Sequence, residues 1–203
     1  MSRKLLVASS NQGKIREIRK MMDDLDYINI VSPADFPDIS RDIVEDGENF
    51  TENALKKARI RAEETGVLTL ADDSGLVVDY LNGRPGVYSA RYAGENADDH
   101  DNNVKLLEEL EDVQFEERRA HFVCVAALVD PEKENEYSVK EKCSGYILSE
   151  QRGEQGFGYD PLFYVPEYEK TMAELSVDVK NMISHRAKAV NKVRKLLINR
   201  YSE

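Results

Sequence analysis

The segment 120–129 constrains the fold more than any other part of the chain, because nearly all of its residues are apolar. A strand that is apolar on both faces is typical of the interior of a sheet that is covered on both sides. Around it, strand-like and amphipathic helical segments alternate, which predicts an α/β protein with a mixed sheet. Strands are expected at Leu5–Ala8, Tyr27–Val31, Val67–Ala71, Leu76–Leu81 and Glu136–Leu148, and helices at Lys14–Leu25, Asn49–Thr65, Asp98–Leu110 and the C-terminal segment carrying Val190, Val193 and Leu197.

The length and charge of the chain narrow its class. With 203 residues and no internal repeat or Ser/Gly linker, residues 1–203 are expected to form a single domain. The 28 Lys and Arg residues against 39 Asp and Glu residues give a net charge of −11. Such an acidic surface argues against a nucleic-acid partner and against an anionic membrane face. Cys124 and Cys143 lie in strand-like runs without CxxC spacing, which indicates a reduced, intracellular protein, with a single disulfide as the alternative. The N-terminus lacks a long apolar run, so we expect a cytoplasmic protein.

The first candidate site is the segment Ser9–Lys14, where a strand gives way to a helix. Backbone N–H groups at a helix N-terminus attract anions, and Lys14 adds a positive charge while Gly13 permits close approach. The segment is no P-loop, because Ala8 and Ile15 stand where that motif needs glycine and serine or threonine. A plain helix cap by Ser10 or Asn11 is the alternative.

The second candidate is the pair Asp72 and Asp73, followed by Ser74 and Gly75. Carboxylates at the end of a strand suit Mg²⁺, which prefers oxygen ligands, and they also suit general-base work on a water molecule. Since successive strand residues point to opposite faces, only one of the two is expected to face the site. An acidic turn is the alternative.

Two further segments lie in the second half of the chain. In Gly156–Pro161, glycines flank Phe157 and Tyr159, an arrangement that lets an aromatic ring stack on a flat ligand. A hairpin or loop with buried aromatics is the alternative and the commoner explanation of such a segment. In Ser184–Arg186, two potential cations open the last helix, where the helix dipole favours anions. A bound anion or carbonyl oxygen would compensate them.

Taken together and in order, these blocks resemble the dITP/XTP pyrophosphatase (inosine triphosphatase) family, over about residues 4 to 198. The resemblance rests on Ser9–Lys14, Glu52–Ala54 with Lys57 and Ala58, Ala71–Leu76, Arg84–Gly94, Gly156–Pro161 and Ser184–Arg186. It implies a mixed, twisted β-sheet with flanking helices in two lobes around a central cleft, assembled as a homodimer. It also implies a Mg²⁺-dependent hydrolase that converts ITP, dITP and XTP to the monophosphate and pyrophosphate.

The resemblance further implies a role for individual residues. Asp73 would bind Mg²⁺ and act as the catalytic base, and Glu45 is the candidate second metal ligand. Many relatives have two glutamates before Thr-Gly in this loop, whereas this chain reads Val44-Glu45-Asp46-Gly47. The residues that would contact substrate are Ser9, Ser10, Asn11, Gln12, Gly13, Lys14, Ser74, Phe157, Gly158, Tyr159, Asp160, Lys180, His185 and Arg186.

The chemistry of the bases fits this assignment. Inosine and xanthosine carry a C6 carbonyl and an N1–H, which would pair with donors from His185 or Arg186 and with the acceptor Asp160. Adenine would leave these groups unpaired, a mismatch that can reject a substrate by a factor of roughly 10⁴. Two other functions remain open on the sequence: a nucleotide sensor without turnover, and a pyrophosphatase for modified pyrimidines of the Maf-like kind.

Overall fold

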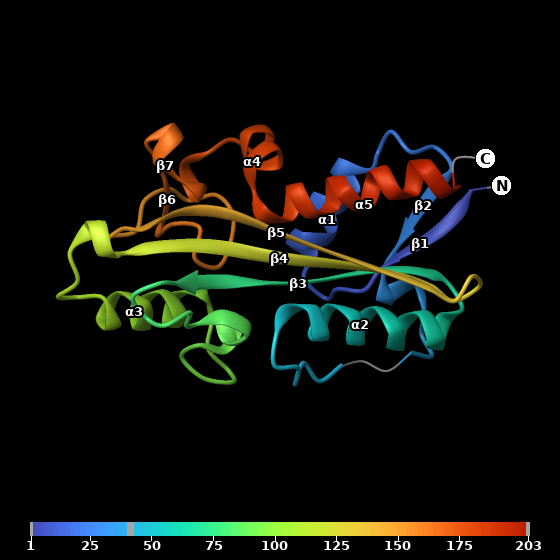
Figure 1. The fold of residues 1–203 in the computed structure, drawn as a ribbon, viewed down its shortest axis with the longest axis horizontal. Coiled ribbons are helices and arrows are strands. Elements are labelled where there is room, and N and C mark those ends of the chain that lie inside the picture. The colour runs from blue at the N-terminus through green and yellow to red at the C-terminus, as the bar shows by residue number, and fades with distance from the viewer. Residues whose placement is uncertain (1, 40–42, 202–203) are drawn as a thin grey trace. The chain divides into compact units, whose positions relative to one another are not determined.

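The computed structural model describes residues 2–39 and 43–201 and shows an α/β fold with a mixed, seven-stranded open sheet (Figure 1). The strand order is β2-β1-β3-β4-β5-β6-β7. The strands are β1 (Arg3–Val7), β2 (Ile28–Val31), β3 (Leu68–Val78), β4 (Arg119–Asp130), β5 (Asn135–Ile147), β6 (Phe163–Val165) and β7 (Lys170–Thr171), and the α-helices are α1 (Gln12–Met21), α2 (Phe50–Thr65), α3 (Asp99–Glu109), α4 (Val177–Ile183) and α5 (His185–Tyr201). β1 pairs in parallel with β2 and β3, whereas β6 pairs antiparallel with β5 and β7, which confirms the expected mixed sheet.

The chain divides into two compact units, as expected for two lobes. Unit 1 comprises residues 1–73, 124–141 and 186–203, and unit 2 comprises residues 74–123 and 142–185. The strands β3, β4 and β5 each contribute residues to both units. The single domain over residues 1–203 and the central cleft stay predictions.

Unit 1 is a sheet covered by helices on both faces, because its strands are apolar on both faces. One face of β1, β3 and β4 packs Leu5, Leu70 and Cys124 against apolar residues of α1 and α5. The opposite face carries small residues such as Ala71 and Ala127, and Figure 1 shows α5 and α2 on opposite sides of β3 and β4. The segment 120–129 thus forms a buried strand, as its composition predicts.

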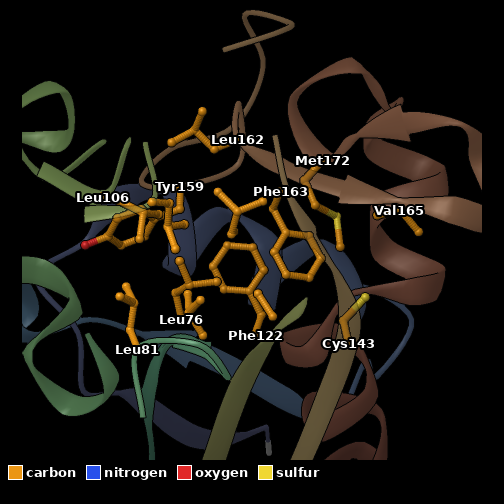
Figure 2. Packing of buried hydrophobic residues seen from close by; sticks show 14 of the residues in the cluster. Leu76, Leu81, Leu106, Phe122, Cys143, Tyr159, Leu162, Phe163, Val165 and Met172 are labelled. Atoms are coloured by element: carbon orange, nitrogen blue, oxygen red, sulfur yellow. The ribbon is translucent and has the colours of Figure 1, made fainter. Parts of the chain in front are cut away.

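Unit 2 has its own apolar core. Phe122 of β4 lies against Phe163 of β6, with ring centroids 4.4 Å apart. Figure 2 shows these two rings at the centre of the cluster, with side chains from β3, α3 and the segment 159–172 around them. This core supports the loop 153–162, which holds several of the expected substrate contacts.

Several local expectations need revision. The acidic turn at 72–75 is wrong: β3 runs without interruption from Leu68 to Val78, and side chains from helices pair with both aspartates, as described below. The first helix begins at Gln12, since the Asn11 side chain caps it. The loop predicted over residues 32–47 contains a short 3₁₀ turn, η1 (Pro33–Asp35), and its residues 40–42 lie outside the described residues.

Two further features of the described chain bear on its class. Cys124 and Cys143 are both buried, and neither forms a disulfide. Within residues 2–39 and 43–201, no helix combines the length and the apolar character needed to cross a bilayer.

Candidate active site

Asp72 and Asp73 occupy the middle of β3 and are both buried, with 3% and 6% of their surface exposed. Because side chains alternate along a strand, Asp72 lies on the same face as Leu70 and Asp73 on the same face as Ala71. The first face meets α1 and α5, and the second meets α2. The two carboxylates therefore belong to different environments in unit 1.

Asp72 lies in a balanced ionic cluster. Lys14 Nζ of α1 is 2.9 Å from Asp72 Oδ2, and Arg186 Nε of α5 is 3.3 Å from the same oxygen. Arg186 Nη1 also pairs with Glu17 Oε2 at 2.7 Å. Burial by itself would lower the pKa of Arg186. The carboxylates of Asp72 and Glu17 together raise this pKa by more than burial lowers it, so Arg186 stays charged. Two cations and two anions make this cluster electrically neutral.

Asp73 lies in a cluster with excess negative charge. Lys57 Nζ of α2 is 3.1 Å from Glu45 Oε1 and 3.7 Å from Asp73 Oδ1. Burial and the nearby Glu45 carboxylate raise the pKa of Asp73 from 3.8 to about 6, although Lys57, Asn53 and Lys14 oppose this shift. Burial alone would lower the pKa of Lys57, but Asp73 and Glu45 together raise it, so the ammonium is charged at neutral pH.

Asn53 of α2 forms hydrogen bonds with both Asp73 and the loop that contains Glu45. Its Nδ2 donates to Asp73 Oδ2 at 3.1 Å, and its Oδ1 accepts from the Gly47 N–H at 2.8 Å. A Cβ at Gly47 would lie only 2.6 Å from Asn53 Oδ1 and 2.9 Å from Glu52 Cβ, so this approach needs glycine. One buried amide thus fixes the strand and the loop to the same helix.

At the N-terminus of α1, the Asn11 side chain caps the helix, as the alternative to an anion site predicted. Asn11 Oδ1 accepts from the N–H groups of Gly13 and Lys14 at 2.8 and 3.1 Å, and Ser9 Oγ accepts from the Asn11 N–H at 3.2 Å. Ser10 and Gln12 are exposed and Lys14 is half-buried against Asp72. Phosphate binding by Ser9–Lys14 stays a prediction, and a phosphate there would meet a helix N-terminus that is already ordered.

Some of the unit 2 residues that are expected to contact the base lie close together. Asp160 Oδ2 accepts from Lys180 Nζ at 2.6 Å and from the Phe157 N–H at 3.1 Å, and Lys180 Nζ lies 5.1 Å from the centre of the Phe157 ring. Tyr159 is buried and donates its hydroxyl to the carbonyl of Ser89. Phe157, Asp160 and Lys180 thus form one local group.

His185 and Ser74 lie elsewhere in unit 2. The His185 ring stacks on Phe122, with centroids 4.8 Å apart and planes inclined by 17°, and only 6% of the residue is exposed. Ser184 directly precedes the first residue of α5, where it was predicted as the cap. Ser74 lies in β3, next to Asp73.

Sequence reasoning gave no site role to Asn53, Lys57 or Glu17, and it did not foresee that Asp72 pairs with Lys14 and Arg186. A signal for the first two exists in α2, where Asn53, Lys57 and Arg61 recur every four residues beside Ala54, Ala58 and Ala62. Polar residues at this spacing lie on one helix face, and all six residues are buried. A buried polar stripe on a helix needs partners on the sheet, and Asp73 is one of them.

The donor set around Asp73 fits a divalent cation. Mg²⁺ is held in proteins by one or two carboxylates together with water and substrate phosphates. Asp73 and Glu45 supply two carboxylates against the single charge of Lys57. The raised pKa of Asp73 reflects chiefly its burial, to which the Glu45 carboxylate adds a smaller contribution. Among the described residues, no cluster of three or more His, Cys, Asp or Glu side chains forms a preassembled metal cage.

Fold and site together define an α/β protein with a buried carboxylate–lysine centre on an interior strand. The sequence model of the Ham1 family matches residues 5–196, so the chain belongs to the Ham1 family.

Individual relatives are similar over almost their whole length. The dITP/XTP pyrophosphatase of Geobacter sulfurreducens is 54% identical over 187 residues, which cover 92% of this chain and 92% of that protein. The dITP/XTP pyrophosphatase of Desulforamulus reducens is 50% identical over 198 residues, covering 98% and 97%. The solved structure of a HAM1 protein from Coxiella burnetii superposes with a TM-score of 0.88 at 42% identity, covering 97% of this chain and 99% of that one.

Proposed function

We propose that this chain is a Mg²⁺-dependent nucleoside-triphosphate pyrophosphatase that hydrolyses XTP, ITP and dITP to the monophosphate and pyrophosphate. Removal of these nucleotides would prevent their incorporation into DNA and RNA. The observation that carries the proposal is the negatively charged centre of Asp73, Glu45 and Lys57, built on the second face of β3. The names of the Geobacter and Desulforamulus relatives support the substrate class.

In the proposed reaction, a water molecule attacks the α-phosphorus and the bond to the bridging oxygen of the β-phosphate breaks. Pyrophosphate leaves with that oxygen, and the water proton passes to the carboxylate of Asp73. A base works best when its pKa is close to the working pH, and the pKa of Asp73 near 6 meets this condition. Lys57 and Asn53 keep the carboxylate in place for this step.

Asp73 and Glu45 are the residues that would hold Mg²⁺. When bound, the ion offsets the negative charge of the phosphates and of the reaction's transition state. Lys14 and Arg186 are the cations assigned to the phosphates, together with the backbone and side chains of Ser9–Gly13. Asp72 holds Lys14 and Arg186 in one orientation by its paired contacts.

Base recognition is assigned to residues of unit 2. Phe157 supplies a ring for stacking, Asp160 an acceptor for the purine N1–H, and His185 a donor for the C6 carbonyl, with Gly158, Tyr159, Lys180 and Ser74 as further contacts. The stack of His185 on Phe122 holds the imidazole plane fixed. Discrimination against adenine then arises because a buried polar group left unpaired by the wrong base costs binding energy. Guanine shares the C6 carbonyl and the N1–H, so its exclusion must come from contacts around the 2-position.

We further propose that the protein acts in the cytoplasm as a homodimer, as the resemblance implies. Its mass in solution, measured by light scattering on the eluate of a sizing column, tests the dimer. A mass of one chain, 23.1 kDa, would contradict it.

Pyrophosphate release with a nucleotide panel tests the activity. Purified protein is incubated with Mg²⁺ and ITP, dITP, XTP, GTP or ATP. We expect release from the first three and far less from GTP and ATP, and we expect Asp73→Asn to abolish it while nucleotide binding persists. Binding without release would favour a sensor, and equal release from ATP would contradict the proposed specificity.

A further inference from the structure

The peptide groups on both sides of Gly158 are held by side chains of α3. Asp99 Oδ2 accepts from the Gly158 N–H at 2.6 Å, and Asn103 Nδ2 donates to the Gly158 carbonyl oxygen at 2.9 Å. Asp99 and Asn103 are four residues apart and therefore lie on the same face of the helix. We call this pair of contacts the α3 clamp.

The clamp acts at the most pliable point of the loop. Gly158 adopts a positive φ of 62°, and glycine has more backbone freedom than any other residue. The N–H belongs to the peptide before Gly158 and the carbonyl to the peptide after it. Fixing both groups fixes the φ and ψ angles of Gly158, and with them the direction in which the preceding Phe157 projects.

The neighbouring residues are tied down by other contacts. The Phe157 N–H donates to Asp160, the Tyr159 hydroxyl donates to the Ser89 carbonyl, and the Ala173 N–H donates to the Asp160 carbonyl. These contacts come from within the loop and from segments other than α3. The peptide groups of Gly158 are therefore held by α3, whereas the neighbouring residues are held by other parts of unit 2.

We propose that Asp99 and Asn103 are positioning residues that set the loop 157–160 for recognition of the purine base. The inference rests on the proposed function, since it takes this loop as the base-binding element. Neither residue is assigned a contact with substrate. They act by holding Gly158 in the bound conformation before the nucleotide arrives, which lowers the entropic cost of binding.

Asn102 offers a matched control for Asn103. The two asparagines are adjacent on α3 and equally buried, each 3% exposed. Asn102 bonds instead to the backbone of the segment 90–93, accepting from the Ala93 N–H at 2.8 Å and donating to the Ala90 carbonyl at 3.2 Å. Replacing either asparagine by alanine removes a buried amide, but only the change at position 103 opens the clamp.

The test combines hydrogen exchange with steady-state kinetics on the full chain. In Asn103→Ala and Asp99→Ala, backbone amides of residues 155–160 should exchange faster than in the unaltered protein, whereas Asn102→Ala should leave them unchanged. The KM for ITP should rise roughly tenfold in each clamp variant, the loss expected for one such hydrogen bond, with kcat nearly constant because base contacts act in ground and transition states alike. Inhibition by tripolyphosphate, which has no base, should not change.

Asp99→Asn is the conservative rescue, because it keeps an acceptor oxygen. It should restore both the slow exchange and the low KM that Asp99→Ala loses. Asp99 is exposed, so its alanine variant keeps the test available if Asn103→Ala fails to fold.

Two results would overturn the clamp proposal. One is an unchanged exchange rate at residues 155–160 in the clamp variants, and the other is faster exchange with an unchanged KM for ITP. If the unaltered protein releases no pyrophosphate from ITP, the proposed function fails, and with it the role of the clamp in base recognition. The exchange data would then still show whether α3 holds the loop.

Discussion

Asn53 shows how a single side chain can decide the geometry of a site. Its two amide atoms join Gly47 of the loop to Asp73 of the strand. Asn53 is 1% exposed, and its bond to Asp73 is buried away from competing water, whereas the bond from the Gly47 N–H is partly buried. The position of Glu45, two residues before Gly47, follows from this connection.

A methyl group at Gly47 tests the connection. In Gly47→Ala, the new Cβ would collide with Asn53 Oδ1 and Glu52 Cβ, so the loop must move away from α2. We expect the Mg²⁺ concentration for half-maximal activity to rise at least about fivefold, equivalent to about 1 kcal/mol. A magnesium titration of pyrophosphate release measures this. Wild-type magnesium dependence would show that the loop position does not matter.

At the scale of elements, β3 gives two adjacent aspartates opposite energetic roles. Removing the charge of Asp72 leaves Lys14 and Arg186 without their shared partner in a buried cluster, whereas removing the charge of Asp73 relieves the cost of keeping a buried carboxylate ionised. Asp72→Asn should lower the free energy of unfolding by about 3 kcal/mol, the usual cost of breaking a buried pair. Urea denaturation of both variants, without metal, should show opposite signs; equal losses would contradict the assignment of the two faces.

The stabilisation by Asp73→Asn should depend on pH. The folded pKa of Asp73, about 6, exceeds the ordinary value of 3.8, so ionisation of this group opposes folding. Well below pH 3.8 the carboxyl is protonated in both the folded and the unfolded state and does not affect the free energy of unfolding. As the pH rises from 3.8 to about 6, ionisation of Asp73 lowers the free energy of unfolding, and this loss is complete above about pH 6. In metal-free protein, Asp73→Asn should therefore gain roughly 1 to 3 kcal/mol at pH 8 and almost nothing at pH 4. A gain that is constant with pH would refute the shift.

The elements also show what the sequence can predict. The apolar run 120–129 and the alternation of strands and helices are local patterns, and they predict the mixed α/β sheet correctly. The continuity of β3 through Asp72 and Asp73 cannot be predicted from local sequence, because it depends on partners from three helices far apart in the chain: Lys14, Lys57 and Arg186. Local propensity favours a turn at such a sequence, and only tertiary contacts overrule it. The alternation of side chains still places the two aspartates on opposite faces, as predicted.

At the scale of the whole molecule, a net charge of −11 looks unsuited to a triphosphate ligand. The structure resolves the conflict locally. Arg186 is buried and Lys14 is half-buried beside Asp72. Asp73 and Glu45 carry one negative charge more than Lys57 offsets, which a divalent cation would neutralise. The net charge is therefore compatible with a single nucleotide bound together with its metal ion, and the absence of a nucleic-acid partner stays a prediction.

Metal binding should be measurable in the stability of the whole chain. A ligand that binds only the native state raises its stability with concentration, so Mg²⁺ should raise the melting temperature by several degrees in the unaltered protein. The increase in melting temperature should vanish in Asp73→Asn. It should persist in Asp38→Asn, which changes an exposed residue between β2 and α2. Differential scanning calorimetry without nucleotide measures the effect independently of turnover. An equal increase in Asp73→Asn would place the metal elsewhere.

Turnover of ITP in ¹⁸O-labelled water, followed by mass spectrometry of both products, tests the central claim most directly. Attack of water on the α-phosphorus places the label in the monophosphate and leaves pyrophosphate unlabelled, and this is the result we predict. Label in pyrophosphate, or the release of inorganic phosphate in its place, would contradict the proposed reaction.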